Sequence, residues 1–455
     1  MRADLAGDLD ARELREHFGG ALTYSLRSTN AGGAGDASPE ERRARLLAAA
    51  ADYDLIEIEH PGDAVRELLD RVPPEKRLIA WRGTAAGLEQ LRSRFALVAE
   101  TAARRYQLAV DATTIEQTIA PLQLLERLAR SDVTAHATGP EGTWTRLLAS
   151  RLGAPVVHGT VSATGLDGML SVDRLQHDYG LPVLGNLRDL YGIVGGSVSY
   201  SLAPRVFNRG FRALGLPALC LPFSTPDFDR FFRGVVETGL PALGAPPRGL
   251  TVVTPHKEAA LTVASLTTRR AGEAGAANSL VRAGSAWQAA TTTAIRDALK
   301  EAGFGAAGRR AAVVGCGGAG RTVAGELKEL GASVTLVNRG QARGDYASGL
   351  LGLPWVHLGS FDPGGYEILV NATPLSERSP VDVGALGDDA AIVDLVYTPS
   401  GRTALMTAAR ARGLVAIGGR RVLAGEAARQ YQLMTGQPLP PDALEAVYEA
   451  VAGQG

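Results

Sequence analysis

The sequence predicts an α/β protein with parallel sheets, divided into two or three domains. The chain has 455 residues, about three times the length of a typical domain. Short apolar runs alternate with helix-like stretches through the first third of the chain, which is the rhythm of parallel α/β units. A glycine-rich turn between two apolar runs near residue 315 is typical of a βαβ unit that binds a nucleotide.

The first part of the chain is predicted to begin with a charged helix over residues 8–18, followed by strands and further helices. Ser38, Pro39, Glu40 and Glu41 are typical of a helix start, with an N-cap, a proline in the first turn and acidic side chains near the positive end of the helix dipole. The strands are expected at residues 21–26, 55–58, 77–81, 108–110, 133–135 and 155–157.

A second α/β block is expected to begin near Tyr191, after a connection over residues 171–188. Its nucleotide-binding unit is predicted over about residues 308–418. The chain then returns as two helices, over residues 422–436 and 441–451.

The glycine-rich turn indicates which nucleotide is bound. Residues 311–321 read AAVVGCGGAGR, an apolar strand, a turn and the start of a helix. Glycines let the backbone approach a pyrophosphate, and the helix N-terminus offers it free N–H groups. The next strand ends at Asn338 and Arg339, where a ribose is normally recognised, and an arginine there suits a 2′-phosphate. The sequence therefore predicts NADP(H), with Arg343 as a second cation.

Composition excludes several other classes of protein. The net charge of −1 provides no general attraction to nucleic acid or to an anionic membrane. Cys220 and Cys316 support neither a disulfide framework nor a zinc cluster, and no metal site is expected. No apolar run is long enough to span a bilayer and no signal-peptide pattern opens the chain, so a cytoplasmic protein is expected.

The second part of the chain resembles shikimate dehydrogenase in several motifs that occur in the family's order. YGIVGGSVSYSLAP at residues 191–204 resembles its substrate loop, and VVTPHKEA at 252–259 resembles the turn that carries its catalytic lysine. AANSL at 276–280 resembles its substrate-binding asparagine segment. NATP at 371–374 and DLVYTP at 394–399 resemble later strands of its nucleotide domain.

This resemblance implies a role for individual residues in transferring a hydride between a nicotinamide and a hydroxylated ring. Lys257 is expected to be the acid–base residue, with Thr293 at the position of its catalytic partner. The expected substrate-binding residues are Ser199, Ser201, Asn278, Glu426 and Tyr397. The expected cofactor-binding residues are Gly315, Gly317, Gly318, Ala319, Asn338, Arg339, Arg343, Asn371 and Thr373.

The departures from the family pattern gather at the expected substrate site. Thr293 stands where the family carries an aspartate paired with the lysine, and Glu426 stands where it carries a glutamine. Tyr200, Ala203 and Val253 replace a histidine, a serine and a threonine of the family. A substrate hydroxyl left unpaired at Val253 or Ala203 costs about 1–3 kcal/mol. We therefore expect a shikimate-like acid with altered substituents as the substrate.

The first part of the chain resembles type I 3-dehydroquinate dehydratase, an enzyme also known as a fused partner of shikimate dehydrogenase. The runs that carry the resemblance are ALTYSLRSTNAGG at residues 21–33, GPEGTWTR at 139–146 and LGAPV at 152–156. The match extends over about residues 20–172, so the first two strands of the family's eight-stranded barrel are expected to be missing.

The chemical roles of that family are predicted to be vacant in this chain. Gln107 stands at the position of the Schiff-base lysine, Arg82 at that of the histidine and Ala31 at that of the glutamate. Arg27 and Arg146 remain at positions that bind an anion in the family. We therefore expect a ligand-binding or structural role rather than dehydration.

The sequence thus predicts an α/β fold in which a truncated barrel-like domain precedes a shikimate dehydrogenase-type substrate domain and a Rossmann NADP-binding domain. The expected boundaries are 1–175, 189–300 completed by 420–455, and 301–419. The expected partner is a small alicyclic carboxylic acid, and exposed sheet edges leave open a homodimer. Two alternatives remain: a non-catalytic binding or scaffold protein, and an ordinary dehydrogenase in which Thr293 acts through water.

Overall fold

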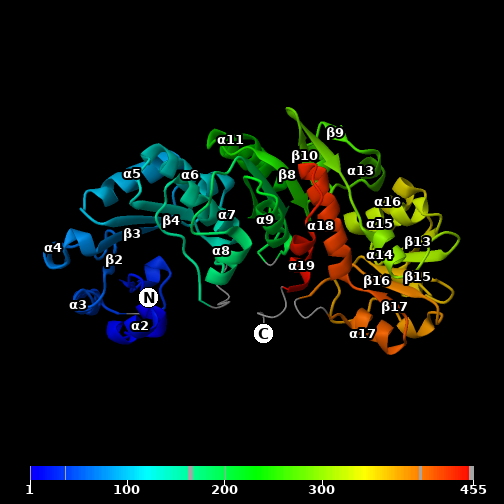
Figure 1. The fold of residues 1–455 in the computed structure, drawn as a ribbon, viewed down its shortest axis with the longest axis horizontal. Coiled ribbons are helices and arrows are strands. Elements are labelled where there is room, and N and C mark those ends of the chain that lie inside the picture. The colour runs from blue at the N-terminus through cyan, green and yellow to red at the C-terminus, as the bar shows by residue number, and fades with distance from the viewer. Residues whose placement is uncertain (1, 36, 162–167, 200, 399–401, 450–455) are drawn as a thin grey trace. The chain divides into compact units, whose positions relative to one another are not determined.

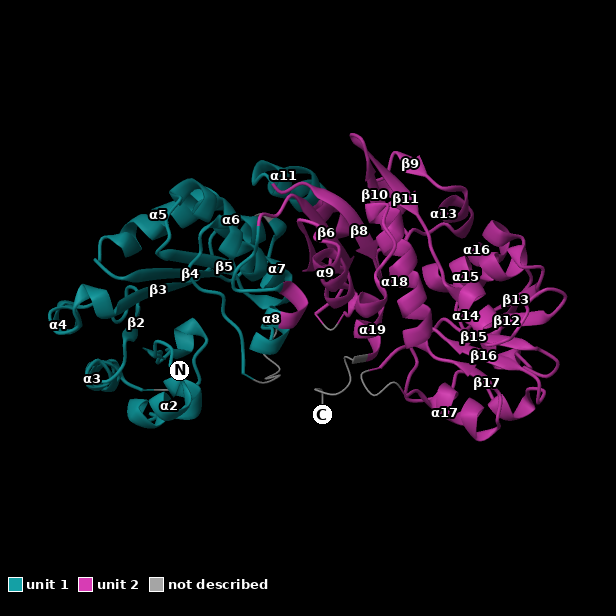
Figure 2. Ribbon diagram, viewed as in Figure 1, with its two compact units in different colours: residues 1–176, 180–185, 233–244 teal, residues 177–179, 186–232, 245–455 magenta. Residues whose placement is uncertain are grey.

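The computed structural model describes residues 2–35, 37–161, 168–199, 201–398 and 402–449 (Figure 1). These residues form two compact units, shown in different colours in Figure 2. Unit 1 comprises residues 1–176, 180–185 and 233–244, and unit 2 comprises residues 177–179, 186–232 and 245–455. No helix among the described residues is long and apolar enough to cross a membrane.

Unit 1 is built on a parallel sheet whose strand order follows the chain order, β1-β2-β3-β4-β5. The strands are β1 (Thr23–Tyr24), β2 (Leu55–Glu59), β3 (Arg77–Gly83), β4 (Arg105–Val110) and β5 (Val133–Ala137). The main helices are α1 (Ala3–Ala6), α2 (Ala11–His17), α3 (Pro39–Ala49), α4 (Arg66–Leu69), α5 (Leu88–Ala99), α6 (Ile115–Leu128), α7 (Gly139–Ala149) and α8 (Val172–Tyr179), whose end passes into unit 2.

Most local predictions for unit 1 are confirmed. Ser38 caps α3 by accepting a hydrogen bond from the Glu41 N–H, and the Glu41 carboxylate accepts one from the Ser38 N–H. The helix predicted over residues 8–18 is confirmed as α2, which begins later than expected because the Asp10 side chain caps it by accepting the Arg12 N–H. A further short helix, α1, precedes it and was not predicted. The sixth predicted strand is wrong: residues 155–157 form a loop, where exposed Pro155 has no N–H to donate.

The N-terminal residues cover one edge of this sheet. Arg2 pairs with Ser25 in an isolated parallel bridge, and the Ala3 N–H donates to the Ser25 carbonyl over 2.8 Å. Tyr24 donates a hydrogen bond to the carboxylate of Asp8. An exposed sheet edge invites association with another chain, and the N-terminal segment shields the sheet edge at β1.

Unit 2 contains a mixed sheet followed by a fully parallel one. The mixed sheet has the order β7-β6-β8-β10-β11-β9, and β10 runs antiparallel to β8 and β11. Its strands are β6 (Asp189–Gly195), β7 (Ala218–Ser224), β8 (Pro247–Val252), β9 (Leu266–Thr267), β10 (Ser279–Ala283) and β11 (Ala286–Ala290). Its helices are α9 (Ala203–Ala213), α10 (Phe228–Phe231), α12 (Ala259–Thr262) and α13 (Arg269–Ala274); the intervening α11 (Leu240–Ala242) belongs to unit 1.

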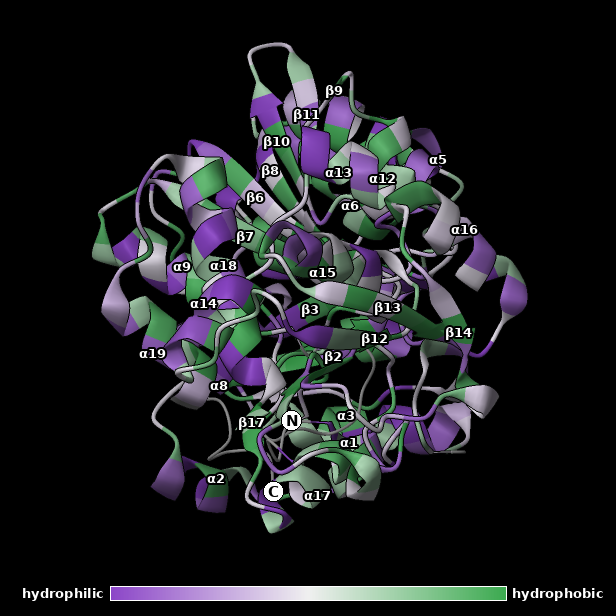
Figure 3. Cartoon of the chain, turned by 90° about the vertical axis from the view of Figure 1, so that its right-hand side faces the viewer, coloured by the Kyte–Doolittle hydropathy of each residue, from purple (hydrophilic) through white to green (hydrophobic). Residues whose placement is uncertain are grey.

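The parallel sheet has the doubly wound order β14-β13-β12-β15-β16-β17, with the change of direction beside β12. Its strands are β12 (Arg310–Val314), β13 (Ser333–Asn338), β14 (Trp355–His357), β15 (Ile368–Asn371), β16 (Ala391–Asp394) and β17 (Val415–Ile417). The accompanying helices are α14 (Ile295–Glu301), α15 (Gly318–Glu329), α16 (Gln341–Leu351) and α17 (Ala404–Ala411). Figure 3 shows the hydrophobic colouring of β13, whose Val334, Leu336 and Val337 are buried.

The last two helices return to the mixed sheet, as the sequence predicts. They are α18 (Gly419–Thr435) and α19 (Pro441–Glu449). Tyr431 of α18 is fully buried and its ring packs 5.3 Å from the rings of both Phe207 and Phe211 of α9. This aromatic cluster fixes α18 against α9 and the mixed sheet, and residues one or two turns earlier on α18 line the site described below.

Candidate active site

The glycine turn after β12 is built for close backbone approach. Gly315 has a φ of +107°, and a Cβ at Gly320 would lie 1.9 Å from the Gly315 carbonyl oxygen. The Cys316 N–H donates to the Asn338 side chain over 3.3 Å, which ties the turn to the end of β13. α15 begins at Gly318, so its first N–H groups lack partners within the helix. The arrangement offers a pyrophosphate site.

Lys257 is held next to this helix start. The Ala277 N–H donates to the Lys257 carbonyl over 2.7 Å. Buried His256 anchors the same turn through a 2.8 Å hydrogen bond between Nε2 and the Thr225 carbonyl. A Cβ built on Gly318 would lie 3.2 Å from the Lys257 Cβ. The lysine loop and the glycine turn are therefore in direct contact.

A cavity of about 260 Å³ joins the lysine loop to the mixed sheet and to α18. The sequence-predicted residues that line it are Ser201, Asn278, Lys257, Thr293, Ala319, Tyr397 and Glu426. Val253 and Ala203 also line it, together with Ile193, Leu202, Val206, Thr251, Thr254, Thr292, Thr322, Val323, Leu395, Gly419, Val422, Leu423, Ala427, Gln430 and Val447. The structure thus brings together residues that lie as far as 225 positions apart in the chain, from Ser201 to Glu426.

Asn278 is the centre of the hydrogen-bond network in this cavity. Its Nδ2 donates to the Thr292 carbonyl over 2.6 Å and to Glu426 Oε1 over 2.5 Å. Its Oδ1 accepts from the Thr292 N–H over 2.9 Å. Gln430 donates to the Asn278 carbonyl and accepts from the Thr251 hydroxyl. Asn278 and Glu426 are therefore oriented before any ligand arrives.

Thr293 is buried and its polar groups are used locally. Its hydroxyl oxygen accepts the Ile295 N–H over 3.3 Å, and its carbonyl accepts Arg429 Nη1 over 2.6 Å. Ser201 is also buried, and its hydroxyl oxygen accepts the Ala203 N–H. Ser199 lies outside the set of cavity-lining residues, and Tyr200 lies outside the described residues.

Burial raises the pKa of the Glu426 carboxyl above its ordinary value. The positive charge of Lys257 and the hydrogen bond from Asn278 act against that rise. Among the described residues that line the cavity, Glu426 is the acidic side chain and Lys257 the basic one.

The residues predicted to bind the cofactor differ in their surroundings. Arg339 and Arg343 are exposed near the end of β13, where a ribose phosphate can reach them. Asn371 is fully buried: its Nδ2 donates to Asp394 over 2.9 Å and its Oδ1 accepts the Thr373 N–H and hydroxyl. The Asn371 side chain thus shapes the Thr373 turn from within the protein.

Sequence reasoning missed the structural role of Arg321. This side chain is 1% exposed and donates to the carbonyls of Ala274, Cys316 and Gly275 and to the carboxylate of Glu258. It thereby joins α15 to the residue that follows Lys257. The sequence did not indicate that Arg321 is buried, because an arginine in the first turn of a helix is normally solvated.

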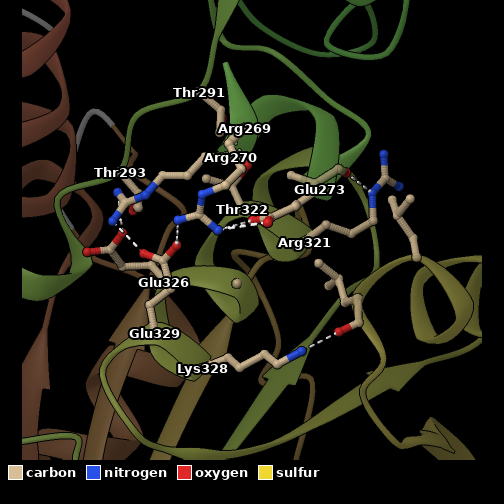
Figure 4. A pocket seen from close by; sticks show the side chains of 14 residues that line it. Arg269, Arg270, Glu273, Thr291, Thr293, Arg321, Thr322, Glu326, Lys328 and Glu329 are labelled. Atoms are coloured by element: carbon tan, nitrogen blue, oxygen red, sulfur yellow. Dashed lines mark hydrogen bonds and ion pairs between the residues drawn. The ribbon is translucent and has the colours of Figure 1, made fainter. Parts of the chain in front are cut away.

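A second cavity, of about 460 Å³, lies where α13 meets α15 (Figure 4). Arg270 pairs with Glu326 and Glu329, and Arg269 pairs with Glu273 and Glu329. Dashed lines in Figure 4 mark hydrogen bonds and ion pairs among the residues drawn there. These charges compensate each other, so the cavity is an ion-paired seam between the two sheets of unit 2.

In unit 1, the positions at which the family resemblance expects catalytic residues hold Gln107, Arg82 and Ala31. Gln107 is buried on β4, where its amide has no nucleophilic amine. Arg82 at the end of β3 donates to buried Glu57 over 2.5 Å. Ala31 lies in the short helix Thr29–Ala31.

Arginines outnumber carboxylates around Glu57. The Arg27 Nε lies 3.9 Å from Glu57 Oε1, and Arg146 contacts the Met169 sulfur. The atoms Arg27 Nε, Arg82 Nη1 and Arg146 Nε are buried without a hydrogen-bond partner. Burial tends to raise the pKa of Glu57, but the charges of Arg82 and Arg27 hold it below its ordinary value. Burial also lowers the pKa of Arg27 and of Arg146 to about 10.

His136 on β5 and His158 lie beside this cluster, with ring centroids 5.6 Å apart. Burial, reinforced by the charge of Arg146, lowers the pKa of His136 well below its ordinary value and that of His158 to about 4. Both rings are therefore neutral near pH 7. No group of three or more His, Cys, Asp or Glu side chains suited to a metal ion occurs among the residues that the structure describes.

Comparisons with known proteins agree with this division of the chain. The family model described as "Type I 3-dehydroquinase" matches residues 8–183, and "Shikimate dehydrogenase substrate binding domain" matches residues 193–280. The bifunctional 3-dehydroquinate dehydratase/shikimate dehydrogenase of Arabidopsis thaliana, described as chloroplastic, is 25% identical over 92% of this chain and 74% of its own length.

Shikimate dehydrogenase (NADP(+)) of Halobacterium salinarum is 32% identical over 58% of this chain and 99% of its own length. The structure of shikimate 5-dehydrogenase from Thermus thermophilus in complex with NADP(H) and shikimate is 28% identical, with a TM-score of 0.50. It covers 57% of this chain and 99% of the other.

Fold and comparisons together define a fused protein, in which a type I dehydroquinase domain is followed by shikimate dehydrogenase domains. The chain belongs to the shikimate dehydrogenase family.

Proposed function

We propose that the chain is an NADP(H)-dependent oxidoreductase that interconverts an alicyclic hydroxy acid and its ketone, with shikimate, 3-dehydroshikimate or a related ring as substrate. The observation that carries the proposal is the cavity in which Lys257 and Asn278 lie beside the start of α15. The relatives named as NADP(+)-dependent shikimate dehydrogenases support both the reaction and the cofactor. The boundaries 189–300, 301–419 and 420–455 are part of this proposal.

The glycine turn fits a bound dinucleotide. The space beside Gly317 is open, and the α15 N-terminus points its N–H groups outward. Arg339 and Arg343 are the cations that would pair with a 2′-phosphate. NADP(H), when bound, supplies or accepts a hydride.

The protein's own groups then handle the proton and the ring. Lys257 gives or takes the proton at the oxygen that changes between alcohol and ketone. Asn278 and Ser201 orient hydroxyl and carboxylate groups of the ring. Val253 and Ala203 offer no hydrogen bond to those groups, which favours a substrate with altered substituents over shikimate itself.

The test is a titration with NADPH followed by a turnover screen of the full chain. Shikimate, quinate and amino-substituted analogues are offered with NADP⁺ and, separately, with NAD⁺. We expect turnover of at least one ring acid with NADP⁺, and shikimate to be a poor substrate. NADPH binding without turnover of any ring acid would favour the non-catalytic binding protein. Efficient turnover of shikimate would contradict the altered-substrate part of the proposal.

We propose further that unit 1 performs no dehydration and binds an anion. Gln107 offers no amine for an imine, whereas Arg27, Arg82 and Arg146 each present a buried N–H group that makes no hydrogen bond among the described residues. Borohydride treatment with 3-dehydroquinate should leave no covalent adduct on residues 1–175. An adduct found there by mass spectrometry would contradict the first claim. Calorimetry with a ring carboxylate, comparing the wild type with Arg146→Gln, tests the second, and equal heats would contradict it.

A further inference from the structure

The cavity lacks a carboxylate at the position next to Lys257 where the sequence pattern places Thr293. The Thr293 hydroxyl oxygen caps the Ile295 N–H, and a threonine hydroxyl carries no charge at neutral pH. A lysine that exchanges a proton with substrate changes charge in each cycle, so a fixed anion nearby stabilises its protonated form. Another side chain of the cavity lining must therefore supply that anion.

Glu426 meets this requirement. It lies on α18 and lines the same cavity as Lys257, and one carboxylate oxygen is fixed by Asn278 Nδ2 at 2.5 Å. The structure records no hydrogen bond to its other oxygen among the described residues, which leaves Oε2 for a ligand or for Lys257. Lys257 lines the same cavity, and its positive charge opposes the rise in the pKa of Glu426.

The helix α18, which carries Glu426, is also hydrogen-bonded to the segments that carry Thr293 and Asn278. Arg429 donates to the Thr293 carbonyl and to Asp297, and Gln430 donates to the Asn278 carbonyl. These contacts, within about one turn of α18, hold the carboxylate in register with the segments that carry Thr293 and Asn278. A side chain held this way is positioned for function rather than for solvation.

We propose that Glu426 is the carboxylate partner of Lys257, replacing from α18 the charge that Thr293 lacks. This inference rests on the proposed function and names a further residue for it. In the oxidation direction, the substrate C–H bond breaks as a hydride leaves for the nicotinamide, and the O–H bond breaks as its proton moves to neutral Lys257. The C=O bond forms, and the new ammonium group faces the Glu426 carboxylate. Ketone reduction reverses each step.

The placement has a consequence for pH dependence. The titratable or charged groups that line the cavity with Glu426 are Lys257, from the turn after β8, and Tyr397, from the loop after β16. The polar neighbours Asn278, just before β10, and Gln430, on α18, are neutral. Burial raises the pKa of Glu426, so its carboxylate is lost on acidification at a higher pH than an exposed glutamate. We expect an acid limb in kcat/KM that belongs to Glu426.

The experiment compares the full-length wild type with Glu426→Gln, Thr293→Asp and the double variant. Glu445→Gln, an exposed position on α19, is the matched control. We expect Glu426→Gln to lower kcat at least 100-fold and to remove the acid limb. Thr293→Asp in the Glu426→Gln background should recover at least tenfold. An unchanged acid limb in Glu426→Gln, or an effect confined to KM, would overturn the inference.

A second measurement does not depend on turnover. An amine-acylating reagent labels neutral Lys257, and mass spectrometry follows its rate at pH 8. Removing a nearby anion disfavours the ammonium form, so Glu426→Gln should label severalfold faster than wild type, whereas Glu445→Gln should not. Equal rates would overturn the inference even if the enzyme turns over. Faster labelling without turnover of any ring acid would reject the proposed function and keep the lysine–carboxylate pairing.

Discussion

The two units use similar parallel strands to display polar side chains, yet the side chains that they bring together differ in kind. In unit 2, Lys257 and Glu426 line one cavity beside the start of α15. In unit 1, the corresponding region holds Gln107, Arg82 and two histidines kept neutral by burial. A shared architecture therefore does not imply shared chemistry, because chemistry depends on which residues occupy a few positions.

The difference extends to charge balance. Around Glu57 in unit 1, guanidinium groups are in excess and several of their N–H groups lack partners. In the unit 2 cavity, one basic and one acidic side chain, Lys257 and Glu426, occur among the described lining residues. The first arrangement is suited to holding an anion, and the second to passing a proton.

The largest effect is expected from removing the lysine. Lys257→Ala should lower kcat by about 10²–10⁴-fold, because a positioned acid–base group contributes that much. Steady-state kinetics with the best substrate found in the screen measure it. Lys300→Ala, an exposed lysine on α14, should change little. Unchanged turnover in Lys257→Ala would remove the basis for contrasting the two units.

Acidification should destabilise unit 1 through its histidines. Their folded pKa values lie below the unfolded value of about 6.5, so the unfolded state binds more protons below that pH. The free energy that the two neutral histidines contribute to folding is therefore fully present above about pH 6.5, and it is lost as the pH falls toward 4. The expected loss is about 1.4 kcal/mol per pH unit for each histidine.

Hydrogen exchange of residues 133–149, followed by mass spectrometry from pH 7 to pH 5, measures this loss. The variant His136→Gln should show a shallower dependence on pH. Exposed His357 provides the control substitution, His357→Gln. The same slope in all three proteins would show that the buried histidines do not set the acid stability of unit 1.

Restoring two hydrogen-bonding side chains to the cavity should raise the activity of unit 2 on shikimate. Val253→Thr together with Ala203→Ser should raise kcat/KM for shikimate by about tenfold or more, since each unpaired hydroxyl costs about 1–3 kcal/mol. When these two substitutions are combined with Thr293→Asp, the gains in kcat/KM should not be additive, because all three residues line one cavity. A fall in shikimate turnover would indicate that the cavity excludes shikimate by shape.

The smallest predicted effect concerns the cofactor. We expect NADPH to bind at least tenfold more tightly than NADH, or about 1.4 kcal/mol. Arg339→Ala should remove most of that preference, because the guanidinium pairs with the 2′-phosphate. Calorimetry with both nucleotides measures it, with exposed Arg410→Ala as control. Equal affinities in the wild type would remove the NADP(H) assignment.

Much of the fold could be predicted because its sequence signals depend on residues that are close together in the chain. The capping box at Ser38, the glycine turn at Gly315 and the apolar strand at residues 310–314 each depend on neighbours within a few residues. The strand predicted at residues 155–157 failed although its pattern is apolar, because Pro155 has no N–H to donate to a neighbouring strand.

The sequence by itself determined the α/β class, the glycine turn and the identity of each substituted residue. The tertiary structure decided which of those residues meet. Only folding shows that Arg321 is buried as a joint between α15 and the lysine loop, and that Glu426 shares a cavity with Lys257. The physical reason is that these contacts span 63 and 169 residues of chain, where no local periodicity carries information and packing alone sets the distance.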